Sequence, residues 1–152
     1  MKVFVRWPSK EEIQKNLPKC FSKFKQTRIV LDCTEVPVEK PKCLKCTIKT
    51  YSFYKGTNTL KFLVGVAPSG LITYISKCYG GRTSDKEIFK QSRLIERLLP
   101  FKDGIMVDKG FLIEEECSVH FIELIRPAFL KKGTQLSSTA ALETIDIAAA
   151  NF

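Results

Sequence analysis

Two short apolar runs in the chain each end in an aspartate. The run 29–31 (Ile-Val-Leu) precedes Asp32, and the run 105–107 (Ile-Met-Val) precedes Asp108. Such runs are typical of central strands, where an ionised carboxylate is costly unless a partner compensates its charge. Each Asp could simply cap the loop after its strand, or the two could share a partner such as a divalent cation. The occurrence of two such positions in one small domain favours the shared partner.

The remaining hydrophobic pattern divides the chain into alternating strands and helices. Strands are predicted over residues 28–36, 59–66, 71–78, 104–108 and 121–125. Helices are predicted from Ser9 to Pro18, from Ser84 to Pro100, over 113–119 and over 139–149. The first two helices begin at capping boxes, in which a Glu follows the Ser by three residues. A Pro-Ser-Gly turn at 68–70 joins two strands into a hairpin, and the basic stretch 37–50 reads as a loop. This order predicts a mixed sheet flanked by helices, an α/β fold.

Within this outline, spacing also predicts which side chains are buried. The apolar face of the helix that begins at Ser84 consists of Ile88, Phe89, Ile95, Leu98 and Leu99. Phe21 and Phe24 are expected to hold the N-terminal arm onto the domain.

The composition is that of a globular protein whose charge is unevenly distributed. Of the 152 residues, 44% are hydrophobic and 27% charged. The sequence contains no run of about eighteen apolar residues, the length needed to span a membrane. Charged residues occur too early at the start of the chain for a signal peptide. Residues 1–62 hold 14 Lys/Arg against 5 Asp/Glu, whereas residues 63–152 hold 11 of each. This asymmetry suits a polyanion such as nucleic acid, and it suits a well-solvated surface equally.

The six cysteines are expected to be reduced thiols, since nothing indicates secretion. Cys33 and Cys78 fall in predicted strands, where they would be small core residues. Cys43 and Cys46 form a CxxC pair, but a structural zinc site needs two more ligands, and the single His120 is distant in sequence. We therefore expect this pair in an exposed loop.

Two aspartates, if the fold brought them together, would have the chemistry to bind a hard divalent cation. Mg²⁺ prefers oxygen ligands and commonly takes only one or two protein carboxylates, with water and phosphate completing the shell. Such cations stabilise both the attacking and the leaving oxygen of a phosphodiester. The reaction class would be cleavage or transfer of a nucleic-acid phosphodiester with Mg²⁺ or Mn²⁺, normally with a third carboxylate. A phosphotransferase of the haloacid dehalogenase pattern would need an Asp where Thr34 stands, and His120 has no evident nucleophile as partner.

Several motifs, in order along the chain, resemble those of one family. They are Leu31-Asp32-Cys33-Thr34-Glu35, Tyr51-Ser52 with Tyr54-Lys55, residues 59–65, Pro68-Ser69-Gly70, residues 80–86 (Gly-Gly-Arg-Thr-Ser-Asp-Lys) and Asp108-Lys109-Gly110-Phe111. Together they resemble the DDE superfamily endonuclease domain, in particular that of PIF/Harbinger-like transposases, including those linked to THAP domains. The resemblance extends to about Leu136. It implies a ribonuclease-H-like fold, in which the first and fourth strands lie side by side.

The resemblance implies roles for individual residues. Asp32 and Asp108 would be the catalytic, metal-binding carboxylates. Asp85 would support the metal site, although an Asp in the first turn of a helix also stabilises the helix dipole. Contacts with the phosphates of DNA are expected from Lys55, Lys61, Arg82, Lys86 and Lys109, the last of which stands where the family often has Arg.

The C-terminal part departs from the family pattern. The family continues into a long helix that carries the third acidic residue, whereas residues 142–152 match nothing of that motif. Glu143 and Asp146 are the candidates to replace the missing ligand. The chain is thus divided into a helical arm (1–27), an endonuclease core (28–136) and a truncated or divergent tail (137–152), which leaves the fold incomplete at the C-terminus.

Two functions remain open on this evidence. The first is a transposase-derived endonuclease, crippled by the missing ligand, that acts on DNA in the nucleus or cytoplasm. It would act with a separate DNA-binding subunit or as a homo-oligomer, and without contact with a membrane. The second is a domesticated, non-catalytic module for DNA binding or protein docking.

Overall fold

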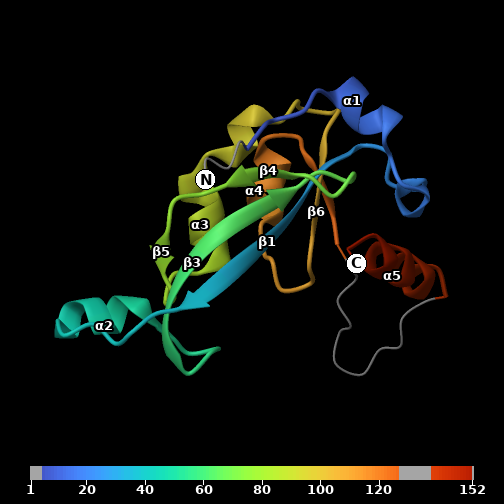
Figure 1. The fold of residues 1–152 in the computed structure, drawn as a ribbon. Coiled ribbons are helices and arrows are strands. Elements are labelled where there is room, and N and C mark those ends of the chain that lie inside the picture. Colours follow the sequence, from blue (N-terminus) through green and yellow to red (C-terminus); the bar gives the residue numbers. More distant parts are fainter. Residues whose placement is uncertain (1–4, 127–137, 152) are drawn as a thin grey trace.

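A seven-stranded sheet lies at the centre of the computed structural model, which describes residues 5–126 and 138–151 (Figure 1). The strands are β1 (Thr27–Pro37), β2 (Tyr51–Ser52), β3 (Thr57–Val66), β4 (Ile72–Ile75), β5 (Tyr79–Gly80), β6 (Gly104–Val107) and β7 (Glu123–Ile125). The α-helices are α1 (Lys10–Lys15), α2 (Leu44–Thr50), α3 (Asp85–Ser92), α4 (Glu114–Val119) and α5 (Ser138–Asn151), and the 3-10 helices are η1 (Lys19–Phe21) and η2 (Leu94–Arg97).

The sheet is mixed, with the order β2-β3-β1-β6-β7 and with β4 and β5 paired to β3. Strand β1 runs antiparallel to β3, with Cys33 opposite Leu63. It runs parallel to β6, with Leu31 opposite Val107, and β6 in turn runs parallel to β7. The predicted α/β class, a mixed sheet flanked by helices, is confirmed, and the first and fourth predicted strands are neighbours.

The two faces of the sheet bury separate cores, because successive side chains of a strand point to opposite faces. Ile29 and Leu31 belong to the larger core, which also contains side chains from α3 and α4. Val30, between them, packs against the smaller core, which includes Phe21 of η1 and Ile147 of α5. Figure 1 shows α3 and α4 grouped together, with α5 on the other side of β6. Phe21 holds the arm in place, as predicted.

The N-terminal arm is fixed by a buried carboxylate. Asp103 is only 2% exposed, and its Oδ1 lies 3.0 Å from the Nζ of Lys10 in α1. Its Oδ2 accepts a hydrogen bond of 3.0 Å from the Leu99 amide and lies 3.8 Å from the Nε of Arg28. The Arg28 guanidinium in turn lies 5.2 Å from the Trp7 ring centroid. A buried charge needs such partners, and here they tie the arm to β1 and to the loop before β6.

Residues 44–50 form helix α2, where the sequence predicts a loop. The short helix receives support from β3, because Asn58 Nδ2 donates to the Thr47 carbonyl at 2.9 Å and to Thr50 Oγ1 at 2.8 Å. Asn58 is 5% exposed, so this contact is sheltered from water. Such a tertiary cap compensates for a sequence with two Thr and one Ile, residues of modest helix propensity. Cys43 and Cys46 are exposed at the start of this helix.

The predicted helix from Ser84 to Pro100 breaks early. It ends at Ser92, because Arg93 adopts a left-handed conformation with φ of 51°, and the chain continues as η2. The Ser92 carbonyl accepts a hydrogen bond of 3.0 Å from the Tyr74 hydroxyl. As a result Leu94 is fully buried, whereas Leu99, expected in the core, is 52% exposed.

The predicted strand over 71–78 is shorter in the structure, where β4 covers only Ile72–Ile75 and a separate short strand, β5, follows at Tyr79–Gly80. Ser76 Oγ accepts the Leu63 amide at 2.9 Å, so a side chain takes a place that a backbone carbonyl would hold in a regular ladder. Cys78 lies beyond this interruption and is exposed, which corrects its assignment to the core.

Gly65 provides a test of the packing between β3 and its neighbours. A Cβ at this position would lie 2.3 Å from Ile29 Cδ1 and 3.0 Å from Tyr74 Cβ, and Ile29 has no exposed surface into which it could move. We expect Gly65→Ala to lower the free energy of unfolding by about 1–3 kcal/mol in urea denaturation. Gly110→Ala is the control, because its Cβ would meet only Asp108 Oδ1 at an ordinary 3.4 Å. Equal losses in both variants would contradict this reading of the packing.

Candidate active site

The parallel pairing of β1 with β6 brings Asp32 and Asp108 together. The register pairs Leu31 with Val107, so each Asp stands one residue beyond this pair. Alternation turns Asp32 to the same face of the sheet as Val30. Asp108 opens the turn after β6, where its Oδ1 accepts a hydrogen bond from the Gly110 amide. Two strands distant in sequence thus place two carboxylates side by side.

A polar pocket of about 720 Å³ opens at this point. Its lining residues are Asp32, Cys33, Thr34, Glu35, Tyr54, Lys55, Lys61, Asp85 and Asp108. The three predicted carboxylates and two of the predicted basic residues therefore meet in one cavity. Asp32 and Thr34 also line a more apolar pocket of about 550 Å³, bounded by residues of η1, β3 and α5.

The surroundings of the Asp32 carboxyl disfavour its charged form. Loss of hydration raises its pKa above the ordinary value of 3.8, and the nearby carboxylates of Asp108 and Asp85 raise it further. A hydrogen bond from the Cys33 backbone and the charge of Lys61 oppose the shift but do not cancel it. Mutual repulsion of this kind is relieved when a cation binds between the groups.

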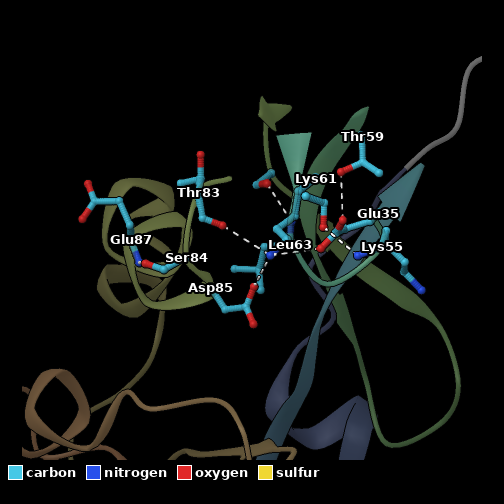
Figure 2. Close-up of polar contacts among 11 residues, drawn as sticks. Glu35, Lys55, Thr59, Lys61, Leu63, Thr83, Ser84, Asp85 and Glu87 are labelled. Atoms are coloured by element: carbon cyan, nitrogen blue, oxygen red, sulfur yellow. Dashed lines mark hydrogen bonds and ion pairs between the residues drawn. The ribbon is translucent and has the colours of Figure 1, made fainter. Parts of the chain in front are cut away.

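Lys61 forms a bridge along one wall of the pocket, as Figure 2 shows. Its Nζ lies 3.2 Å from Glu35 Oε1 and 3.0 Å from Asp85 Oδ1, and it donates to the Thr83 carbonyl at 3.3 Å. Glu35 and Lys61 are directly opposite each other on β1 and β3, while Asp85 is the first residue of α3. Burial alone would lower the pKa of Lys61, but Asp85 and Glu35 outweigh burial and raise it. The ammonium therefore stays charged and joins the sheet to α3.

Glu35 is a residue of this site that sequence reasoning did not select. Its side chain is 7% exposed, and its Oε2 accepts a hydrogen bond of 2.8 Å from Thr59 Oγ1. Burial raises its pKa, but hydrogen bonds from Ser52, Thr59 and Lys61 together lower it below the ordinary value. The only signal in the sequence was a second carboxylate three residues after Asp32. Its partner depends on the register between β1 and β3.

Cys33, next to Asp32, is not a nucleophile in this arrangement. It is partly buried against the larger core. Burial raises the pKa of its thiol strongly, and the charge and hydrogen bonding of Asp85 raise it further. The thiolate is the reactive form of cysteine, so a thiol kept protonated is inert.

The other predicted basic residues occupy different surroundings. Lys55 lines the pocket, with its Nζ 5.0 Å from the Tyr54 ring centroid, and the Arg82 guanidinium lies 5.9 Å from the Phe53 ring centroid. Lys86 pairs with Glu115 at 3.0 Å and Glu116 at 3.3 Å, so a DNA phosphate would compete with two carboxylates for it. Lys109 follows Asp108 in the turn after β6.

Helix α5 holds the two candidates for a third metal ligand. Neither Glu143 nor Asp146 is among the described residues that line the polar pocket, and Asp146 Oδ2 lies 2.5 Å from Lys23 Nζ. Within residues 5–126 and 138–151, no three His, Cys, Asp or Glu side chains are grouped closely enough to hold a metal ion. The described residues therefore provide no closed cage of three or more protein ligands, the arrangement that a structural metal site needs.

The mixed sheet flanked by helices is consistent with the ribonuclease-H-like fold of DDE nucleases. The family model of the DDE superfamily endonuclease matches residues 31–152, and the chain belongs to this family. The match continues past Leu136, where the motif resemblance stops, and includes α5. Membership implies an endonuclease of the transposase type, with DNA as substrate.

No curated protein and no solved structure matches the chain. None of the helices in the described part of the chain is long and apolar enough to cross a membrane.

Asp32→Asn should stabilise the metal-free protein at about pH 7. The folded state holds the Asp32 proton more tightly than the unfolded state, so ionisation above the ordinary pKa of 3.8 costs stability, and an amide avoids this cost. Because Asp32 keeps contact with solvent, we expect a gain below about 1 kcal/mol, or roughly 1–4 °C in the melting temperature. The gain should vanish below about pH 4. Asp85→Asn, which removes a partner of Lys61, should lower the melting temperature instead, and a loss for Asp32→Asn would contradict the interpretation.

Glu35→Gln should destabilise the protein in a pH-dependent way. The folded pKa of Glu35 lies below its ordinary value of 4.5, so its charge contributes stability above pH 4.5 that is lost as the pH falls through the folded pKa. We expect the free energy of unfolding at about pH 7, measured by urea denaturation, to fall by about 1–3 kcal/mol. The reason is that the buried Lys61 loses one of its two carboxylate partners, Glu35, and keeps only Asp85. The difference from wild type should shrink toward about pH 3. A loss that is constant across this range would show that the charge of Glu35 is unimportant.

Proposed function

We propose that this chain is a transposase-derived, divalent-metal-dependent DNA endonuclease domain of the PIF/Harbinger-like type. The observation that carries the proposal is the adjacency of Asp32 and Asp108 at the paired ends of β1 and β6. Their carboxylates would hold Mg²⁺ or Mn²⁺, which would supply Lewis-acid activation of the scissile phosphate and of the attacking water. The raised pKa of Asp32 supports this role, since it reflects negative charge that lacks sufficient compensation.

The other pocket residues prepare the cavity for a polyanion. The Lys61 ammonium offsets part of the negative charge of Glu35 and Asp85, so the wall formed by these carboxylates repels a phosphate less than its composition suggests. Lys55 lines the same pocket and can contact the DNA backbone electrostatically. A DNA substrate also leads us to expect the protein in the nucleus.

We further propose that this domain cleaves DNA weakly by itself. Of the further carboxylates considered for the metal site, Asp85 pairs with Lys61 and Asp146 with Lys23, and Glu143 is not among the described residues that line the polar pocket. Two ligands would bind the cation less firmly than three. The same observation favours a second candidate function, a non-catalytic DNA-binding or docking module, if the cation does not bind at all.

Calorimetric titration with Mn²⁺ tests the site directly. We expect saturable binding to the wild type and a loss of binding of at least about tenfold in Asp32→Ala and in Asp108→Ala, because each removes one of two charged ligands. Asp146→Ala is the matched control and should bind as the wild type does, since its carboxylate pairs with Lys23 instead.

A nicking assay on linear duplex DNA then separates the two candidate functions. The endonuclease predicts slow, Mn²⁺-dependent nicking that both pocket variants abolish. Absence of Mn²⁺ binding in the folded wild type, together with retained DNA binding, would support the non-catalytic module. Metal binding that survives both substitutions would refute the assignment of Asp32 and Asp108 as ligands.

A further inference from the structure

The hairpin between β2 and β3 carries two strongly exposed aromatic side chains. Phe53 is 77% exposed and Tyr54 is 85% exposed. Tyr51 supports Phe53 from the side, with ring centroids 5.4 Å apart and ring planes at 86°. Large aromatic side chains normally bury most of their area, so two adjacent exposed rings indicate a surface that binds something.

Each exposed ring is accompanied by a cation. Lys55 Nζ lies 5.0 Å from the Tyr54 ring centroid, and the Arg82 guanidinium carbon lies 5.9 Å from the Phe53 ring centroid. The rings nevertheless keep most of their surface open to solvent, so a flat partner can still reach them. Aromatic rings interleaved with Lys and Arg suit a ligand that is both planar and negatively charged, as a nucleic-acid strand is.

The base of the hairpin is held firmly beneath these rings. The Gly56 amide donates to the Ser52 carbonyl at 2.9 Å, and the Lys55 amide donates to Ser52 Oγ at 3.3 Å. Ser52 is 1% exposed, and its side chain also hydrogen-bonds to Glu35, which Lys61 holds in turn. Gly56 permits the tight turn with a φ of 66°. The rings are thus presented from a fixed support that is connected to the wall of the polar pocket.

The hairpin also stands next to the paired aspartates. Tyr54 and Lys55 line the same pocket as Asp32 and Asp108. In Figure 1 the loop between β2 and β3 projects from the end of the sheet that lies farthest from α1. A DNA strand whose phosphate reaches the aspartates would therefore have its neighbouring bases within the region of Phe53 and Tyr54.

We infer that Phe53 and Tyr54 stack on unpaired bases beside the scissile phosphate, so that the preferred ligand is DNA with a single-stranded or opened segment at this point. The inference rests on the proposed function for its DNA partner and adds the form of DNA that the site selects. Bases inside a duplex are covered by their neighbours and cannot stack on a side chain, whereas unpaired bases offer a free face. Lys55 and Arg82 would follow the backbone of the same strand.

The experiment compares two DNA ligands in buffer that contains EDTA, so that metal binding and cleavage play no part. One is a blunt duplex and the other is the same duplex with a short single-stranded overhang that carries 2-aminopurine. The proteins are the wild type, the double variant Phe53→Leu/Tyr54→Leu, and Phe101→Leu. Phe101 is a matched control because it is 81% exposed but stacks on Phe121 beside Asp103 and Glu123, in a different pocket. Thermal unfolding of each variant checks that the fold is retained.

The wild type should bind the overhang ligand more tightly than the blunt duplex and should quench the 2-aminopurine fluorescence. The double variant should lose this preference and the quenching, with affinity for the overhang about 5- to 150-fold weaker and affinity for the blunt duplex unchanged. Phe101→Leu should behave as the wild type does.

Four results would overturn the inference. If the wild type binds both ligands equally, or the folded double variant keeps the preference, stacking fails while the proposed endonuclease stands on its metal titration and nicking assay. If the double variant loses affinity for both ligands equally, the rings contribute to non-specific DNA binding and not to selection of unpaired bases. If the wild type binds neither ligand in EDTA, the inference fails, whereas the proposed endonuclease, which requires the cation, is decided by its Mn²⁺ titration and nicking assay.

Discussion

The parallel pairing of β1 with β6 is the constraint on which the candidate site depends. Strands separated by some seventy residues in sequence are joined by backbone hydrogen bonds, and the register places Leu31 opposite Val107. Ile29, Leu31, Ile105 and Val107 are all essentially inaccessible to solvent, so apolar packing fixes the register that the hydrogen bonds follow. A slip of one residue would turn these side chains out of the larger core. The stability of the core thus determines the position of Asp32 relative to Asp108.

The pocket is a place where charge is arranged at some cost to stability. Loss of hydration and the nearby carboxylates of Asp108 and Asp85 raise the pKa of Asp32. A cation bound between these groups would compensate their repulsion. Glu35 and Asp85 are treated differently, because Lys61 compensates both through short contacts from the centre of the pocket wall. The same cavity therefore contains one pair of carboxylates with little compensation and another pair that shares the positive charge of Lys61. This division suggests which carboxylates serve ligand binding and which serve structure.

The polar pocket is bordered by two surfaces of different chemistry. On one side the Lys61 bridge and Ser52 connect the wall to the β2–β3 hairpin, whose aromatic side chains face solvent. On the other side Asp32 adjoins an apolar hollow toward η1 and α5, where Phe21 and Ile147 form the smaller core. The aspartates thus lie between a cationic, aromatic rim and an apolar floor. A substrate with charged phosphates and flat bases has complementary groups for the first of these surfaces.

The sequence by itself determined β1, β3, β4, β6 and β7, their order along the chain and the two aspartates that end buried runs, because alternation, capping boxes and turn residues are local signals, whereas the two-residue strands β2 and β5 were not predicted. The family resemblance supplied the neighbourhood of β1 and β6, which spacing alone does not reveal. Tertiary contacts decided the rest. Helix α2 forms where Asn58 of β3 supports it, and α3 stops at Arg93, whose neighbour Ser92 receives the Tyr74 hydroxyl. Glu35 meets Lys61 only through the β1–β3 register, and Asp146 meets Lys23 only through the packing of α5 on η1. Each of these depends on residues far apart in the chain, whose proximity no local pattern encodes.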